Sequence, residues 1–218
     1  GPWVDDVNDK LGFNDKLIGG TKGSHLVIKN ELLREAVGVS EFFFENKDGR
    51  IVLLLPFFDR VIVGTSDLPI ENPDDARCTK EEEEYFLDLI KRVFPTIPVT
   101  HEQIVFRFSG VRPLEYMKAK TTGQITRDHS IKFNEVGGIP VISLVGGKWT
   151  SFRAFSEQAT DEALKRLGVH RKSSTESIPL RGGANYPVSE IEKEKYVHSL
   201  TEKTGLSADY ISVLFERY

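Results

Sequence analysis

The stretch Val145-Gly146-Gly147-Lys148-Trp149-Thr150 joins a short apolar segment, residues 140–145, to an amphipathic segment. A short apolar run that follows the turn Gly137-Gly138 is typical of a buried strand. Two adjacent glycines let a backbone pass close to a flat or anionic ligand, and the first N–H groups of a helix have no partners within it. The stretch therefore predicts either a ligand seat, with Lys148 adding a positive charge, or a corner whose glycines are needed for packing alone.

The sequence after this stretch is helical in pattern. Residues 151–167 predict a helix that ends at Gly168, and residues 170–177 form a polar linker. We expect the inward face of that helix to consist of Phe152, Phe155, Ala159, Ala163 and Leu167. Capping residues then predict two further helices, over 189–204 and 207–218.

The sequence before this stretch is mostly strand-like. Short apolar segments separated by turns predict strands at 24–28, 42–45, 51–55, 61–63, 104–109, 124–127 and 131–133. The first of these would carry His25 and Val27 on one face, and the second to fourth would form an antiparallel meander. A capping box at Thr79 and Glu82 predicts a helix that begins with a solvated acidic turn and ends at Pro95. Its apolar stripe is Phe86, Leu89, Ile90, Val93 and Phe94.

These patterns predict an α+β fold. A mostly antiparallel sheet with flanking helices would occupy residues 1–170, and the start of an α-helical C-terminal domain would occupy residues 178–218. No apolar run approaches the roughly 20 residues of a membrane-spanning helix, and no signal peptide is visible. We therefore expect a cytoplasmic protein.

Composition excludes several classes of function. The formal net charge of −4 argues against a general binder of nucleic acid. A single cysteine, Cys78, allows no internal disulfide, and the five histidines lack the spacing of a metal site. There is also no Walker A motif, dinucleotide fingerprint or serine-hydrolase elbow.

Cationic side chains stand at the ends of the expected strands. Lys22 and His25 open one strand, Arg112 and Arg127 end two others, and Lys148 follows the strand at 140–145. In a compact sheet these ends would converge into a pocket for a small phosphate or carboxylate. Taken singly, each is more often a surface charge, and His25 is either a proton acceptor or an ordinary buried histidine.

Six short motifs occur in a fixed order along the chain: Gly1-Pro-Trp-Val-Asp5, Thr21-Lys-Gly-Ser-His25, Gly64-Thr-Ser-Asp67, Ser109-Gly-Val-Arg-Pro113, Ile125-Thr-Arg-Asp128 and Gly146-Gly-Lys-Trp-Thr150. In this order and spacing they resemble the flavin-dependent glycerol-3-phosphate dehydrogenases. The resemblance extends through Pro179-Leu-Arg-Gly-Gly183 into the terminal helices. It implies an amino-acid-oxidase-like fold.

The resemblance also implies roles for individual residues. Arg112 and Arg127 would bind the phosphate and hydroxyl oxygens of glycerol 3-phosphate with Lys148 beside them, and His25 and Arg112 would be the catalytic residues. The cofactor FAD would be contacted by Gly1, Gly146, Gly147, Lys148, Trp149 and Thr150. The implied reaction oxidises sn-glycerol 3-phosphate to dihydroxyacetone phosphate by hydride transfer to FAD, whose electrons then pass to a membrane quinone.

The N-terminal half of that family, which grips the ADP part of FAD, has no counterpart in this sequence. We therefore expect a fragment: residues 1–170 as the substrate-binding domain with the returning strand and helix of the FAD-binding domain, and residues 178–218 as a truncated helical domain. Such a fragment is expected to be inactive and not to retain FAD. The intact enzyme would be a homo-oligomer in peripheral contact with the cytoplasmic membrane.

Other functions remain open at this point. The acceptor would be oxygen in a glycerol-3-phosphate oxidase, and an amino acid would be the substrate in the related amino-acid oxidases. A non-enzymatic alternative is an anion-binding module. Residues 199–211 also resemble a helix-turn-helix, but Asp209 and Glu216 would repel phosphate, so we expect no nucleic-acid partner.

Overall fold

The computed structural model describes residues 1–117, 125–180 and 182–217. The chain divides into two compact units, Gly1–Arg171 and Lys172–Tyr218. The assignment of these units to a substrate-binding and a C-terminal domain stays a prediction. Among the described residues there is no helix with the length and apolar character that crossing a bilayer requires.

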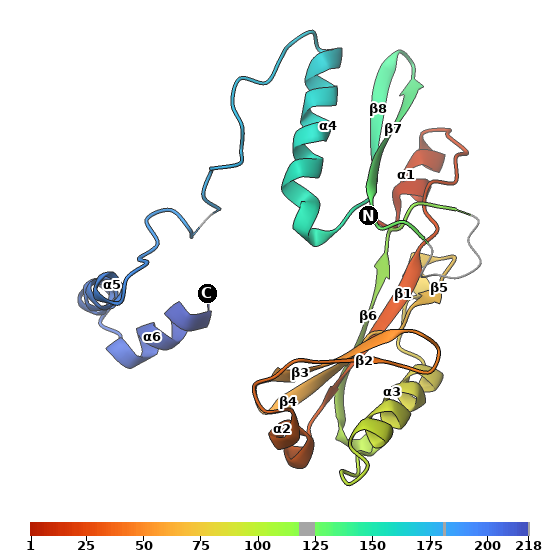
Figure 1. Ribbon diagram of the computed structural model, residues 1–218. Coiled ribbons are helices and arrows are strands. Elements are labelled where there is room, and N and C mark those ends of the chain that lie inside the picture. Colours follow the sequence, from red (N-terminus) through yellow and green to blue (C-terminus); the bar gives the residue numbers. More distant parts are fainter. Residues whose placement is uncertain (118–124, 181, 218) are drawn as a thin grey trace. The chain divides into compact units, whose positions relative to one another are not determined.

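The first unit is built on a six-stranded sheet in the order β2-β3-β4-β1-β5, with β6 also paired to β1 (Figure 1). Its strands are β1 (Thr21–Ile28), β2 (Phe42–Glu45), β3 (Ile51–Phe57), β4 (Arg60–Gly64), β5 (Leu68–Pro69) and β6 (Ile104–Arg112). All of their pairings are antiparallel, so the expected meander is confirmed. Strand β6 runs through Gly110 to Arg112, further than the expected end at residue 109.

Two helices pack on this sheet, α2 (Glu31–Val37) and α3 (Lys80–Val93). Leu26 and Ile28 of β1 lie in one core cluster with Phe86, Leu89 and Ile90 of α3. Because side chains alternate along a strand, Gly23, His25 and Val27 point to the opposite face of the sheet. We call this second face the open face. The helix α2 was not predicted, since two turns give too little periodicity.

The start of α3 both confirms and corrects the sequence prediction. Thr79 and Glu82 form the expected capping box. The acidic turn is only half solvated, however, because Glu82 is only 4% exposed and Glu83 only 8%, whereas Glu81 and Glu84 are exposed. Each carboxylate meets a cation from the sheet, Lys22 for Glu82 and Arg107 for Glu83.

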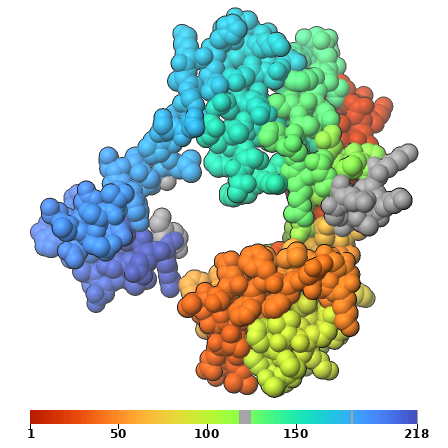
Figure 2. Space-filling view, in the orientation of Figure 1, coloured from red at the N-terminus to blue at the C-terminus, as the bar shows by residue number. Residues whose placement is uncertain are grey.

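A second sheet is the antiparallel hairpin β7 (His129–Val136) and β8 (Ile139–Gly146). After it come the 3₁₀ turn η4 (Trp149–Ser151) and α4 (Phe152–Arg166), which packs against β8 (Figures 1 and 2). The helix α1 (Val4–Lys10) also packs against β8.

Two expectations in this region are wrong. Residues 125–127 form no strand, and residue 124 lies outside the described residues. The face of α4 expected to be inward is not closed, since Phe152 is 50% and Leu167 is 75% exposed. Phe155 stacks on His129 of β7, but nothing in the described parts of this unit covers the two ends of that face.

The second unit holds two helices, α5 (Glu190–Thr204) and α6 (Ala208–Arg217). The predicted capping box at Ser189 and the left-handed Gly205, with φ of 73°, bound α5. Ile211 is buried, whereas Ile191, Tyr210 and Leu214 remain exposed. The described part of this unit therefore has very little core of its own.

Candidate active site

Arg112 is the last residue of β6, and its guanidinium lies on the open face. Nη1 donates to Asp67 Oδ1 at 3.1 Å, and Nη2 donates to Thr65 Oγ1 at 3.0 Å and to the Ser66 carbonyl at 3.2 Å. The side chain is 24% exposed. These bonds use three of the five N–H donors of the guanidinium, so two have no partner among the described residues. Arg112 is thus a fixed and still available anion holder.

His25 lies on the same face, in the middle of β1. Its ring stacks on Phe108 of β6 with the centroids 4.7 Å apart. Burial, and then the charge of Arg112, lower the pKa of His25 below its usual value. Its Nδ1 is enclosed without a partner in the described parts of the chain. The histidine is therefore neutral near pH 7, which is the state that accepts a proton.

Two glycines make room for these side chains. A Cβ added to Gly23 would lie 2.5 Å from Thr65 Oγ1 and 2.7 Å from Arg112 Nη1. A Cβ added to Gly64 would lie 2.7 Å from Cγ of His25. Only hydrogen fits at these two positions, because real Cβ contacts are never this short. The glycines therefore hold the guanidinium and the imidazole close against the sheet.

Arg127 is the second cation near this face. Burial lowers the pKa of Arg112, and the charge of Arg127 lowers it further against the opposing effect of Asp67. The two guanidinium groups are therefore close enough to interact electrostatically. Arg127 is exposed and has no hydrogen bond or ion pair within the described ranges of the chain. His25 and Arg112 thus lie on one face, with Arg127 near enough to influence Arg112, and the roles predicted for the three residues stay predictions.

Lys22 does not join them, contrary to the sequence prediction. Its Nζ donates to Glu82 Oε2 at 2.8 Å and to the Arg77 carbonyl at 2.6 Å, on the α3 side of the sheet. The reason is strand alternation, which sends residue 22 to the face opposite residues 23 and 25. Lys148 has no contact with Arg112 or His25 in the structure as described.

Backbone conformation and contacts within the chain explain the two glycines of the 146–150 corner. Gly146 and Gly147 have φ of 73° and 97°, values that favour glycine. The N–H of Gly147 donates to the Asp128 carbonyl at 3.2 Å, and a Cβ on Gly147 would touch Phe155 at 3.4 Å. Packing therefore explains both glycines without any ligand.

The next three residues have no such explanation. Lys148, Trp149 and Thr150 are exposed, with Trp149 at 92%. Among the described residues, Trp149 has Phe152 as its one ring neighbour, with centroids 6.5 Å apart. An exposed indole next to a free ammonium group fits a flat ring that carries negative charge, so these residues are compatible with FAD. Their contact with its ring stays a prediction.

Gly1 lines a separate hollow of about 340 Å³ between α1 and β8, together with Trp3 and Val7. Asn8 lies in its wall. Asn8 Oδ1 accepts from Ser143 Oγ at 3.1 Å, while its buried Nδ2 has no partner among the residues that the structure describes. A free amide donor is compatible with a polar cofactor, and the predicted role of Gly1 remains untested.

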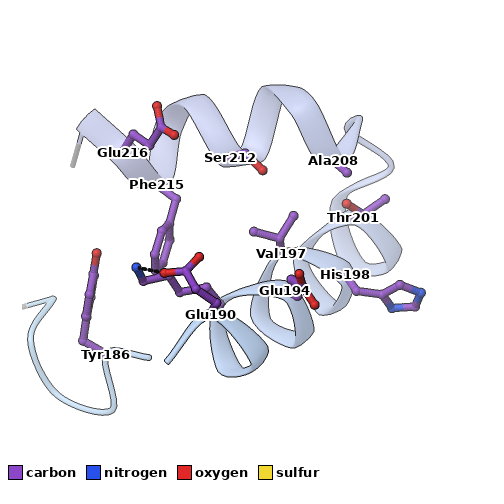
Figure 3. A pocket seen from close by; sticks show the side chains of 11 residues that line it. Tyr186, Glu190, Glu194, Val197, His198, Thr201, Ala208, Ser212, Phe215 and Glu216 are labelled. Carbon is purple, nitrogen blue, oxygen red and sulfur yellow. Dashed lines mark hydrogen bonds and ion pairs between the residues drawn. The ribbon is translucent and has the colours of Figure 1, made fainter. Parts of the chain in front are cut away.

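The second unit contains a larger hollow of about 590 Å³ between α5 and α6 (Figure 3). Glu190, Glu194 and Glu216 line it, and Lys193 is paired with Glu190 at 2.7 Å. Its excess of carboxylates does not suit an anionic substrate. The open face of the sheet is therefore the better candidate site.

Sequence reasoning gave no role to Thr65, Ser66, Asp67 or Phe108. The first three belong to the motif Gly64-Thr-Ser-Asp67, which contributed to the family resemblance without a role for its individual residues. Phe108 stacks on His25 because the register of β1 and β6 places the two residues opposite each other. That register is not visible in either strand alone.

Comparisons with known proteins identify the family of this chain. Residues 1–153 match the family of FAD dependent oxidoreductases (DAO). The chain is 32% identical over 215 residues to a glycerol-3-phosphate dehydrogenase of Synechocystis sp., covering 92% of this chain and 38% of that protein. It is 34% identical over 169 residues to the aerobic glycerol-3-phosphate dehydrogenase of Staphylococcus aureus, covering 77% of this chain and 29% of that protein.

A solved structure shares the fold. The glycerol-3-phosphate dehydrogenase from Bacillus halodurans complexed with FAD superposes with a TM-score of 0.76 and 26% identity, over 98% of this chain and 40% of that one. The predicted α+β fold is thereby confirmed. The chain spans less than half the length of the relatives it matches. Since the family match covers well over half of its residues, the chain belongs to the FAD dependent oxidoreductases.

Proposed function

We propose that the complete gene product oxidises sn-glycerol 3-phosphate to dihydroxyacetone phosphate, with FAD as the hydride acceptor, and that this chain supplies the substrate side of the site. The observation that carries the proposal is the open face, where a fixed Arg112 lies beside a neutral His25 and near Arg127. The names of the relatives support the choice of substrate.

Each side chain has a definite task in this proposal. The two free N–H groups of Arg112 bind oxygens of the substrate, and the charge of Arg127 helps to hold the phosphate dianion. His25 accepts the proton of the C2 hydroxyl on its neutral imidazole ring. When bound, FAD supplies the site that takes the hydride from C2. Proton and hydride together account for the two hydrogens lost in forming the ketone.

The 146–150 corner and Gly1 would hold FAD. Trp149 offers an exposed flat surface and Lys148 an exposed positive charge for the ring. For the electron acceptor we propose a quinone, which requires peripheral contact of a cytoplasmic enzyme with the membrane, and we propose a homo-oligomer. Reduction of a soluble quinone analogue, measured against oxygen consumption, tests the acceptor, and light scattering tests the oligomer.

The test of the main proposal is anaerobic reduction of the flavin. Glycerol 3-phosphate should bleach the FAD of the complete gene product, because C2 oxidation delivers two electrons to it. Bleaching by an amino acid instead would assign the protein to the amino-acid oxidases. No bleaching by either compound contradicts the proposal.

A second candidate function concerns this chain alone. All three partners of Arg112 come from residues 65–67, so the chain is equipped to bind an anion without FAD. Calorimetry with glycerol 3-phosphate should give heat for the chain and none for a variant that combines Arg112→Ala with Arg127→Ala. Equal heats from both proteins would remove the anion-binding module.

A further inference from the structure

A buried ion pair lies directly behind the open face. Lys22 Nζ and Glu82 Oε2 are 2.8 Å apart, and both residues are less than a tenth exposed. Taking two charges out of water is costly, so such a pair adds little stability compared with apolar residues of the same size. Neither residue belongs to the site described above. Their contacts indicate what else the pair does.

The second oxygen of Glu82 reaches the loop between β4 and β5. Ser66 Oγ donates to Glu82 Oε1 at 2.5 Å and accepts from the backbone N–H of Ser24 at 2.9 Å. Ser66 therefore donates to Glu82 and accepts from Ser24 through the same oxygen atom. Ser66 is 1% exposed, so water does not compete for these bonds. The hydroxyl oxygen of Ser66 thereby links the loop to both α3 and β1.

The same loop carries every protein acceptor of Arg112 that the structure describes. The Ser66 carbonyl accepts from Nη2, and its neighbours Thr65 and Asp67 accept through their side chains. Thr65 Oγ1 also donates to the Ser66 carbonyl at 3.0 Å. A displacement of Ser66 therefore moves all three acceptors together.

We infer that Glu82, with Lys22 as its counter-charge, is a positioning residue that acts through Ser66 to set the guanidinium of Arg112 for the anionic substrate. This inference rests on the proposed function. The competing explanation is purely structural, since Glu82 Oε2 also accepts from the Thr79 N–H at 2.8 Å and so caps α3. The two explanations differ in whether the link through Ser66 affects substrate binding.

Ser66→Ala in the complete gene product separates them. It removes the link while leaving the Lys22–Glu82 pair, the cap of α3 and the Ser66 carbonyl in place. Since misplacing a binding group by about 1 Å can cost on the order of 100-fold, we expect KM for glycerol 3-phosphate to rise roughly 10- to 100-fold. The kcat should change less, because His25 does not contact Ser66. Glu82→Gln should act in the same direction.

Glu83→Gln is the matched control. Glu83 lies in the same first turn of α3 and is also buried, but it pairs with Arg107 and His101 rather than with the loop. We expect its KM to stay within about twofold of wild type. An unchanged KM in Ser66→Ala would overturn the inference, and so would an equal rise in Glu83→Gln.

Binding of inorganic phosphate, titrated on the same proteins, keeps this test independent of turnover. If the wild-type protein does not reduce its FAD with glycerol 3-phosphate, the proposed function fails. The inference is then decided by phosphate alone. Weaker binding in Ser66→Ala than in Glu83→Gln supports it, and equal binding overturns it. Because Ser66→Ala leaves the buried charges paired, the result does not depend on whether Glu82→Gln folds.

Discussion

Arg112 and Lys148 are both cations proposed to face one substrate, yet the chain treats them differently. Arg112 has three hydrogen-bond partners, and Gly23 on the neighbouring strand makes room for it. Lys148 is exposed in a turn next to a 92% exposed Trp149. The described part of this chain supplies the partners that hold Arg112. Around Lys148 and Trp149, by contrast, nothing in the described structure covers the side chains.

This difference shows which side chains of the proposed site are already ordered before a ligand binds. The cost of ordering the guanidinium of Arg112 is met during folding, by partners that are present without any ligand. Lys148 and Trp149 would be ordered only when FAD or another part of the complete protein reaches them. Substitutions near Arg112 should therefore change affinity for the substrate, whereas substitutions at the corner should change retention of FAD.

The largest expected effect comes from Arg112→Ala in the complete gene product. Losing a partly buried, charged binding group costs about 2–5 kcal/mol, which is a fall of roughly 30- to 5,000-fold in kcat/KM. Arg107→Ala is the control, because Arg107 lies on the same strand but pairs with Glu83 on the other face. Steady-state kinetics should show the loss in the first variant only. Equal losses would mean that β6, rather than the guanidinium, is what matters.

A smaller effect is expected from Gly23→Ala. The added Cβ would meet Thr65 Oγ1 and the guanidinium of Arg112, which must then move. We expect KM to rise by roughly 10- to 100-fold while the protein stays folded, at a cost of about 1–3 kcal/mol. Gly110→Ala on the neighbouring strand is the control, since a Cβ there meets nothing within 4 Å. A normal KM for Gly23→Ala would show that Arg112 is less fixed than its hydrogen bonds indicate.

Local features of this fold could be predicted from sequence, and features that depend on pairing could not. The capping boxes at Thr79 and Ser189 depend on four consecutive residues, and both are present. The burial of Glu82 depends on Lys22, which is 60 positions away along the chain. The sequence therefore suggested a solvated turn where the structure has a buried ion pair.

The candidate site divides in the same way. That His25 and Val27 share a face follows from strand alternation, and it is confirmed. The exclusion of Lys22 follows from the same rule, which the grouping of cations at strand ends ignored. The roles of Thr65 and Asp67 required the loop's position against β6, which no local pattern specifies.

Trp149→Ala should have little effect on the stability of this chain. A side chain that is 92% exposed makes few contacts, so we expect a change within about 0.5 kcal/mol by chemical denaturation. Phe86→Ala, in the core behind the sheet, should cost about 3–5 kcal/mol in the same measurement. In the complete gene product, Trp149→Ala should lower the FAD content after purification. Full FAD content would leave the corner without its proposed role.

The smallest effect concerns pH and separates His25 from His101. Hydrogen bonds to Glu84 and then Glu83 raise the pKa of His101, whereas burial and then Arg112 lower that of His25. The contribution of His101 to stability is therefore complete below about pH 6.5, the ordinary pKa of histidine, and is lost as the pH rises through the raised value. The contribution of His25 has the opposite sign, being present above about pH 6.5 and lost as the pH falls.

Unfolding curves of the complete protein between pH 5 and pH 9 should resolve the two histidines. His101→Gln should flatten the alkaline side of the stability profile, and His25→Gln should flatten the acid side. Both effects are small, because His101 is exposed to solvent and His25 is only partly buried. If His25→Gln instead flattened the alkaline side, the histidine would be charged in the folded protein. It could then not accept the substrate's proton. The surroundings of Arg112 would bind the anion but would not provide the base.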